Sequence, residues 1–154
     1  YMLLQQLVHQ PFFHDIRTKK QLGYAAGSQY FPIQRLPGIL FFIQSNTAST
    51  DRLTTEILNS LEQLFVQLDS TTLKAWHHSK SVLEQQIRTR DRSLRVKSQR
   101  LWGAIQLGDT SFNRQLRLLD ALGKYQLADW LSDIKQKLSQ NSGWLRLQTT
   151  SQGK

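Results

Sequence analysis

The stretch RTKKQLGY, residues Arg17 to Tyr24, marks a change from helical to extended structure. Its first residues are basic and favour a helix, and Gly23 then provides a helix stop. Tyr24 opens an aromatic segment of short period, which is typical of a strand. Two interpretations of this junction are open. Either Arg17 is a solvated cation and Tyr24 a strand residue, or both side chains face one ligand.

The sequence upstream of this stretch is predicted to be helical. Leu3, Leu4, Leu7 and Val8 form an apolar stripe with helical spacing. Pro11 suits the first turn of a second helical segment over residues 11–21, which Gly23 would end. No capping residue precedes the first helix, and the chain begins with tyrosine, so we expect a fragment of a longer polypeptide.

Downstream, two extended segments flank a turn. Residues 24–34 are predicted to form the first strand, and FPIQRLPG, residues 31–38, holds two prolines and a glycine that favour a turn. The run ILFFIQS, residues 39–45, is almost continuously apolar, which indicates a strand covered on both faces. We therefore expect an antiparallel hairpin with a long loop.

The rest of the chain is mostly helical by pattern. Ser49 or Thr50 is expected to cap one helix, and Ser70 the next. The alternation in GWLRLQTT, residues 143–150, predicts a final strand. The fold class is therefore α+β, with an antiparallel-rich sheet packed against several helices in a single domain over residues 1–154. The apolar positions with helical spacing are Leu53, Ile57, Leu58, Leu61, Leu64, Phe65, Leu68, Leu73, Trp76, Leu83, Ile87, Leu94, Leu101, Trp102, Ile105, Phe112, Leu116, Leu119, Leu122, Leu127, Trp130, Leu131, Ile134 and Leu138.

Composition excludes several classes of protein. The 154 residues are 39% hydrophobic and 20% charged, which fits a globular domain with a core. No run of 18 or more apolar residues occurs, so no membrane span is expected. The absence of cysteine excludes disulfides, thiolate zinc sites and cysteine nucleophiles.

The formal net charge of +9 raises nucleic-acid binding as an alternative function. The basic residues gather where one predicted helix ends and the next begins, and no known nucleic-acid-binding motif accompanies them. A solvated helical face is the favoured interpretation, and no nucleic-acid partner is expected. The cluster consists of Arg88, Arg90, Arg92, Arg95, Lys97 and Arg100.

No complete active site is visible in the sequence. A helical zinc site needs two ligands on one face, as in His-x-x-Glu-His, and neither that frame nor its inverse occurs, so no metal site is expected within this chain. No Gly-rich phosphate loop or nucleophile elbow is present either. The acidic residues Asp15, Asp51, Glu56 and Glu62 are interpreted as surface or capping residues, and the histidines are His9, His14, His77 and His78.

Arg17 and Tyr24 remain as candidate ligand-binding residues. Arginine offers five donors in a rigid fork that suits peptide carbonyls or carboxylates. A tyrosine hydroxyl is a good donor to an oxygen that gains negative charge. Gly23 is expected to permit the turn that lets both side chains face the same space.

A longer comparison strengthens the second interpretation of the junction. The segment PFFHDIRTKKQLGYAAGSQYFPIQRLPGILFFIQS closely resembles the C-terminal half of the pitrilysin and insulin-degrading enzyme family of zinc metallopeptidases. A weaker resemblance continues through Trp102, the Phe112–Arg114 stretch and the closing segment. The positions that match the family's pattern are Pro11, Phe13, Arg17, Thr18, Gln21, Leu22, Gly23, Tyr24, Gln44 and Ser45.

The resemblance implies a clamshell of four related α+β domains, in which zinc is held by an inverted His-x-x-Glu-His motif of the N-terminal half. The C-terminal half, inactive alone, would close over a peptide substrate. Tyr24 would then bind the scissile carbonyl as it becomes an oxyanion, Arg17 would hold a neighbouring carbonyl, and Phe13 would line the pocket.

This chain is accordingly expected to be most of a last domain, with zinc bound elsewhere in the parent enzyme. Its expected partners are the catalytic N-terminal half of the same polypeptide and peptide substrates. The alternative is a degenerate, inactive homologue that acts as a structural or processing subunit. A bacterial member is expected to be periplasmic, and other members cytoplasmic.

Overall fold

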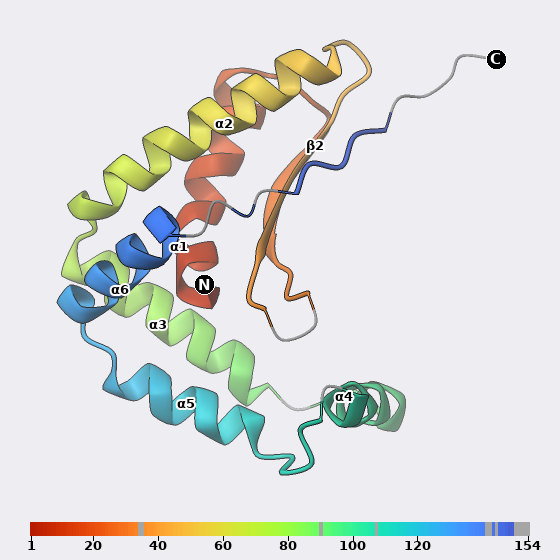
Figure 1. Ribbon diagram of the computed structural model, residues 1–154, viewed down its shortest axis with the longest axis vertical. Helices are drawn as coiled ribbons and strands as arrows, with labels where there is room; N and C mark the ends of the chain where they lie inside the picture. The colour runs from red at the N-terminus through yellow and green to blue at the C-terminus, as the bar shows by residue number, and fades with distance from the viewer. Residues whose placement is uncertain (34–35, 90, 107, 141–142, 144, 150–154) are drawn as a thin grey trace.

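The computed structural model describes residues 1–33, 36–89, 91–106, 108–140, 143 and 145–149. A two-stranded antiparallel sheet lies on one side of the central helix α1, and α2 and α3 lie on its other sides (Figure 1). The predicted α+β class is therefore confirmed. In chain order the elements are α1 (Met2–Phe13), the π-helix η1 (His14–Lys19), β1 (Ala25–Tyr30), β2 (Ile39–Gln44), α2 (Thr50–Gln67), the 3₁₀ turn η2 (Leu68–Ser70), α3 (Leu73–Arg88), α4 (Leu94–Gln106), α5 (Arg114–Lys124) and α6 (Leu127–Gln140).

The first helix runs through Pro11, so the predicted start of a new helix at that residue is wrong. A proline inside a helix removes one backbone hydrogen bond and crowds the preceding turn. Here the neighbouring residues Val8 and Phe12 are almost fully buried, which holds the helix against the core in spite of that cost. The α-helix then continues as the wider π-helix η1, which has i→i+5 hydrogen bonds. One of these bonds is donated by the Lys20 N–H to the Asp15 carbonyl at 3.0 Å.

The helical segment ends before Gly23, which corrects the predicted helix stop. Gln21 takes the left-handed backbone conformation, with φ of 51°, that the prediction assigned to the glycine. The next residue, Leu22, is buried, and its N–H donates to the Ile16 carbonyl at 3.1 Å. Burial of Leu22 therefore sets where the chain turns, and the glycine has a different role, described below.

The hairpin forms as predicted. β1 and β2 pair antiparallel, with Ala25 opposite Gln44 at one end and Tyr30 opposite Ile39 at the other. The turn between them lies at the far end of the hairpin from η1 (Figure 1). The end of η1, the start of β1 and the end of β2 consequently meet at one end of the sheet.

Only one face of β2 is covered by the described residues, so the predicted coverage of both faces is wrong. Phe41 faces the core, where its ring lies 5.0 Å from that of Phe12 in an edge-to-face arrangement. Leu40 and Phe42, which alternate with it, are each 39% exposed. A continuous apolar run is compatible with burial on both faces, but the position of the helices decides whether the second face is covered.

The helix caps are partly as predicted. The Ser49 hydroxyl accepts the Arg52 N–H at 3.4 Å and caps α2. Thr72, not Ser70, caps α3 by accepting the Ala75 N–H at 3.2 Å. The prediction at Ser70 is wrong because that residue belongs to η2, which continues the helical course for one more turn.

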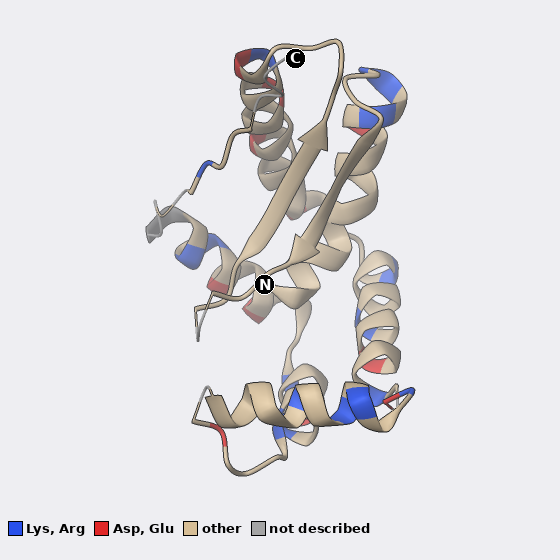
Figure 2. Ribbon diagram, turned by 90° about the vertical axis from the view of Figure 1, so that its right-hand side faces the viewer, with Lys and Arg blue, Asp and Glu red and all other residues tan. Residues whose placement is uncertain are grey.

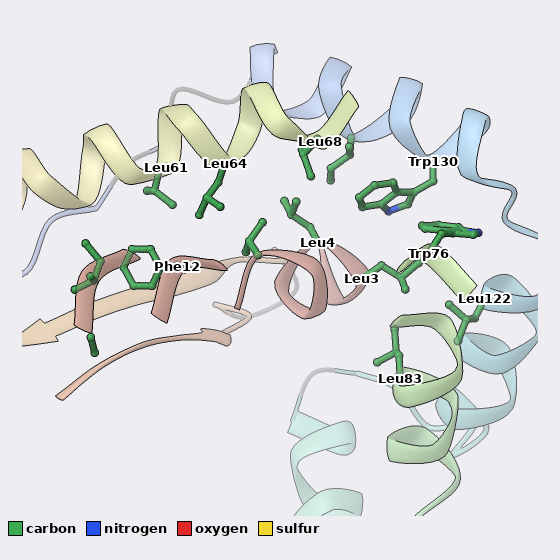
Figure 3. Close-up of a cluster of buried hydrophobic side chains, with 14 of the residues drawn as sticks. Leu3, Leu4, Phe12, Leu61, Leu64, Leu68, Trp76, Leu83, Leu122 and Trp130 are labelled. Atoms are coloured by element: carbon green, nitrogen blue, oxygen red, sulfur yellow. The ribbon is translucent and has the colours of Figure 1, made fainter. Parts of the chain in front are cut away.

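One cluster of apolar side chains joins α1 to α2, α3, α5 and α6. Phe12 lies beneath Leu61 of α2, and farther along, the rings of Trp76 and Trp130 pack at a tilt with centroids 5.0 Å apart (Figure 3). Most of the predicted helical stripe of α2 contributes to this core. Leu58 does not, since it is 49% exposed on the outer side of the helix.

The C-terminal part contributes less to the core than its pattern suggested. Among the described residues of α4 none is buried, and Leu94 and Trp102 are largely exposed. The predicted final strand is absent from residue 143 and residues 145–149, where the alternating Leu145 and Leu147 both stay exposed because no strand pairs with them. Trp144 and Thr150 lie outside the described residues. No helix in the described part of the chain is long and apolar enough to cross a membrane.

Candidate functional site

The predicted site residues belong to the end of the molecule where η1, β1 and β2 meet. Phe13 is the last residue of α1, Arg17 lies in η1, and Tyr24 directly precedes β1. The Tyr24 N–H donates to the Gln44 carbonyl at 3.0 Å, which ties the start of β1 to the end of β2. Backbone structure, not a mobile loop, therefore supports this residue.

Phe13 and Arg17 are in direct contact. The guanidinium carbon of Arg17 lies 5.4 Å from the centre of the Phe13 ring, which is within the range of a cation–π interaction. Arg17 is exposed and Phe13 is half-buried. Within the described part of the chain Arg17 has no carboxylate partner, so the ring orients its guanidinium while the N–H donors stay available to a ligand.

Tyr24 is held by its backbone and leaves its side chain free. The side chain is 61% exposed, and its hydroxyl has no hydrogen-bond partner among the described residues. No hydrogen bond or ring contact in that part of the chain joins it to Arg17 or Phe13. The structure thus brings Phe13 and Arg17 together and leaves Tyr24 at the same end of the sheet, without direct contact to either.

Gly23, directly before Tyr24, is required by close approach. A Cβ atom at this position would collide with the Gln44 carbonyl oxygen and lie 2.8 Å from Cγ2 of Ile43. The missing side chain lets the chain enter the sheet at this point. Close packing therefore explains why this position holds a glycine. Gly23 does not adopt the positive φ that only glycine takes easily.

Replacement of Gly23 by alanine is expected to destabilise the protein by about 1–3 kcal/mol or more, as overpacking does. The obstacle is a backbone carbonyl, which cannot rotate away, so the pairing of Tyr24 with Gln44 should weaken too. Urea denaturation of the 154-residue chain measures the effect. Gly123→Ala is the matched control, because no atom lies within 4 Å of an added Cβ there, and it should leave stability unchanged or raise it. Equal stability of the two variants would contradict the role given to Gly23.

An ion network that sequence reasoning missed lies beside the candidate site. Lys20 Nζ is 2.9 Å from Asp15 Oδ2 and 3.0 Å from Glu56 Oε2, and all three side chains are less than a third exposed. It links η1 to α2. The interpretation of Asp15 and Glu56 as surface residues therefore needs correction, because both are partly buried and paired.

The charges of this network stabilise one another. Burial alone would raise the pKa of Asp15, but hydrogen bonds from Lys20 and Ser60 outweigh it and leave that pKa below its usual value. Burial likewise would lower the pKa of Lys20, and hydrogen bonds to Asp15 and Glu56 reverse the effect, so that its pKa is raised. Asp15 and Lys20 are consequently both charged at neutral pH.

The spacing in sequence explains why the network was missed. Residues five apart, such as Asp15 and Lys20, lie on different sides of an α-helix. A π-helix has a wider turn with i→i+5 bonds, and it brings these two residues together. No pattern in the sequence predicted a π-helix at this place, and Glu56 comes from another helix altogether.

The histidines do not form a metal site in the described part of the chain. There, no three His, Asp or Glu side chains are close enough to hold a metal ion. His9 has another role, since its Nδ1 lies 3.1 Å from the Ser28 carbonyl oxygen and joins α1 to β1. His14, His77 and His78 are exposed.

The basic cluster is partly neutralised. It surrounds the end of α3 and the start of α4, where Lys and Arg residues gather on the ribbon (Figure 2). Arg88 pairs with Glu84 at 2.8 Å, and Arg100 pairs with Asp91 at 2.7 Å. Arg90 lies outside the described residues. The ion pairs and the exposure of the remaining side chains fit the solvated helical face that the sequence favoured.

Comparison with known proteins covers most of the chain. The family model described as "PQQ synthase PqqF-like, C-terminal lobe domain 4" matches residues 3–102. The coenzyme PQQ synthesis protein F of Pseudomonas protegens is 31% identical over 111 residues, which are 72% of this chain and 13% of that protein. The A-factor-processing enzyme of Saccharomyces cerevisiae is 29% identical over 153 residues, which are 97% of this chain and 15% of that protein.

The fold is also similar to a solved structure. The crystal structure of pitrilysin superimposes with a TM-score of 0.72 and 21% sequence identity, over 84% of this chain and 14% of that one. This supports the fold. The chain spans about one seventh of the length of the curated relatives that it matches.

Proposed function

The chain belongs to the PqqF-like C-terminal lobe domain 4 family, within the pitrilysin and insulin-degrading enzyme group that its sequence resembles, and we propose that it is the noncatalytic C-terminal domain of a zinc-dependent endopeptidase. In this role the domain closes over a peptide substrate and supplies donors to it. The full enzyme would include this domain and a catalytic half elsewhere in the same polypeptide. The chain covers only 13% and 15% of these two relatives, which is compatible with a catalytic half outside it.

The contact between Arg17 and Phe13 is the observation that carries the proposal. The aromatic ring holds a guanidinium whose donors have no partner within the described part of the chain. A peptide bond offers carbonyl oxygens that match those donors, and Phe13 adds an apolar surface beside them. Arg17 would therefore bind a substrate carbonyl next to the bond that is cleaved.

Tyr24 supplies a second donor from the same end of the sheet. Its backbone is anchored to Gln44, and its side chain extends into solvent. The hydroxyl is proposed to donate to the scissile carbonyl oxygen as that oxygen gains negative charge. Such a bond is stronger in the transition state than with bound substrate, and therefore accelerates the reaction.

Among the described residues, no three His, Asp or Glu side chains lie close enough together to hold a metal ion. We assign the zinc to the catalytic half, in keeping with the resemblance. This chain's own residues bind and orient the peptide. The chain by itself is proposed to lack peptidase activity.

The test of the proposal is the variant Arg17→Ala in the full-length protein, measured with a quenched fluorogenic peptide. A hydrogen bond from a charged donor contributes about 1.5–3 kcal/mol, so kcat/KM should fall about ten- to a hundredfold. Part of the loss should be a raised KM, because Arg17 would already bind the substrate before the reaction.

Arg92→Ala provides the matched control, since Arg92 is also an exposed arginine but lies far along the chain, before α4. It should leave kcat/KM unchanged. A wild-type kcat/KM in Arg17→Ala would remove the proposed role of this residue.

The alternative is an inactive homologue that serves as a structural or processing subunit. The endopeptidase and the inactive homologue differ in the catalytic half, which must contain His-x-x-Glu-His if the enzyme is active. A full-length protein that has this motif and cleaves the peptide rejects the alternative. Absence of the motif together with absence of cleavage rejects the endopeptidase.

A further inference from the structure

We propose that Lys20 is a positioning residue, whose ammonium group between Asp15 and Glu56 fixes the end of η1 so that Arg17 and Tyr24 face the same peptide. This inference rests on the proposed function of Arg17 and Tyr24. It assigns a role to a residue that touches no substrate and acts only through its neighbours.

The geometry joins two elements through one cation. Asp15 belongs to η1, Glu56 belongs to α2, and Lys20 Nζ lies 2.9 and 3.0 Å from their carboxylates. The three side chains are between 20% and 27% exposed, so solvent screens the network less than it screens a surface pair. Lys20 thereby connects the end of η1 to the long helix α2.

The segment that Lys20 holds is unfavourable on its own. A π-helix is a rare arrangement that persists where the surrounding structure stabilises it. The residue after Lys20, Gln21, has a positive φ of 51°, which is strained for a residue other than glycine. Lys20 lies between the π-helix and Gln21, and its ion pairs oppose a return of either to a more favourable backbone conformation.

Lys20 is also placed between the two proposed donors. It follows Arg17 by three residues and precedes Tyr24 by four. Ile16 and Leu22 anchor the same segment by burial. The two ion pairs of Lys20 add electrostatic attraction that joins the end of η1 to α2.

Other charged groups near the network do not replace this role. Lys19 is exposed and has no ion pair in the described part of the chain, although its charge acts on Asp15 from a distance. Glu62 lines the same shallow hollow as Lys20 and Glu56 on the surface of α2. Lys20 pairs with a carboxylate of η1 and one of α2, whereas Lys19 forms no ion pair with a described residue, which makes Lys19 a matched control.

The experiment compares Lys20→Met with Lys19→Met in the full-length protein. Each substitution removes one positive charge and retains an unbranched side chain of similar length. Turnover of the fluorogenic peptide and backbone hydrogen exchange across residues 14–24 are measured for both. Lys20→Met should lower kcat about tenfold or more, with a smaller effect on KM, because small misplacements of catalytic groups have effects of that order. It should also speed hydrogen exchange, and Lys19→Met should change neither.

Two further variants separate positioning from a general loss of stability. Lys20→Arg can still bridge two carboxylates, and it should recover most of the lost kcat. Glu56→Gln should lower kcat less than Lys20→Met does. The double variant should resemble Lys20→Met alone, because both substitutions break the same contact.

The outcomes distinguish this inference from the proposed function. Loss of turnover in Arg17→Ala and Tyr24→Phe, with normal kcat in Lys20→Met, overturns the positioning role and leaves the proposed function intact. Wild-type turnover in Arg17→Ala and Tyr24→Phe overturns both. Unchanged hydrogen exchange over residues 14–24 in Lys20→Met overturns the positioning role whatever the activity. A loss of kcat in the double variant that equals the sum of the two single losses, in free energy, overturns it also.

Discussion

The full-length protein with Tyr24→Phe is expected to turn over peptide about a hundredfold more slowly than the wild type, or slower still. Loss of one hydrogen-bond donor to a developing oxyanion raises the activation free energy by roughly 2.7–4 kcal/mol in comparable sites. The substitution removes a single oxygen from a side chain that is 61% exposed. The backbone bond from Tyr24 to Gln44 remains, so the fold and the zinc content of the enzyme should not change.

Tyr30→Phe is the control for this prediction. Tyr30 lies at the opposite end of β1, beside the hairpin turn, and loses the same atom. Its turnover should equal that of the wild type. Near-normal turnover in Tyr24→Phe, or equal losses in both variants, would show that the Tyr24 hydroxyl does not act in the transition state.

Replacement of Trp76 by alanine should lower the free energy of unfolding by about 3–5 kcal/mol, the usual range for removal of a buried aromatic side chain. Trp76 is 1% exposed and packs against Trp130, with ring centroids 5.0 Å apart and ring planes tilted by 45°. Its ring also lies 5.7 Å from Lys80 Nζ, which donates to the Tyr125 carbonyl. The cavity would therefore affect the contacts of α3 with both α5 and α6.

Trp102→Ala tests whether this effect comes from burial. Trp102 has the same side chain but is 62% exposed on α4. Its replacement should change the stability of the chain by about 0.5 kcal/mol or less. Urea denaturation followed by circular dichroism measures both variants. A similar loss of stability in the two variants would mean that burial of Trp76 does not cause the effect.

Local signals in the sequence predicted much of the fold. The hydroxyl of Ser49, followed by an apolar stripe of helical period, identified the start of α2 because a capping bond involves only neighbouring residues. The hairpin was equally visible from the turn residues between two apolar runs. The prediction failed where a local preference competed with burial, as at Pro11, which lies inside α1 between the buried Val8 and Phe12.

The sequence proposed the residues of the candidate site, but it gave no indication of the groups that support them. Arg17 and Tyr24 were singled out by residue type and position, Phe13 followed from the family resemblance, and the structure adds the ring contact between Phe13 and Arg17. The network around Lys20 left no signal in the sequence, because Asp15 lies five residues before Lys20 and Glu56 belongs to a different helix. The apolar stripe of α4, in which no described residue is buried, shows the opposite error, because a correct period gave no information about burial.

By itself, the sequence determined the class of fold, the hairpin and most of the helices, because these depend on periodicity, turn residues and capping along the chain, and its resemblance to known proteins indicated the family. The tertiary structure decided which face of the hairpin is covered, why Gly23 is a glycine, and that Lys20 joins η1 to α2. These features depend on atoms distant in sequence, such as the Gln44 carbonyl beside Gly23 and the Glu56 carboxylate beside Lys20. Close packing and ion pairing act over a few ångströms in space, and only the folded chain brings those atoms together.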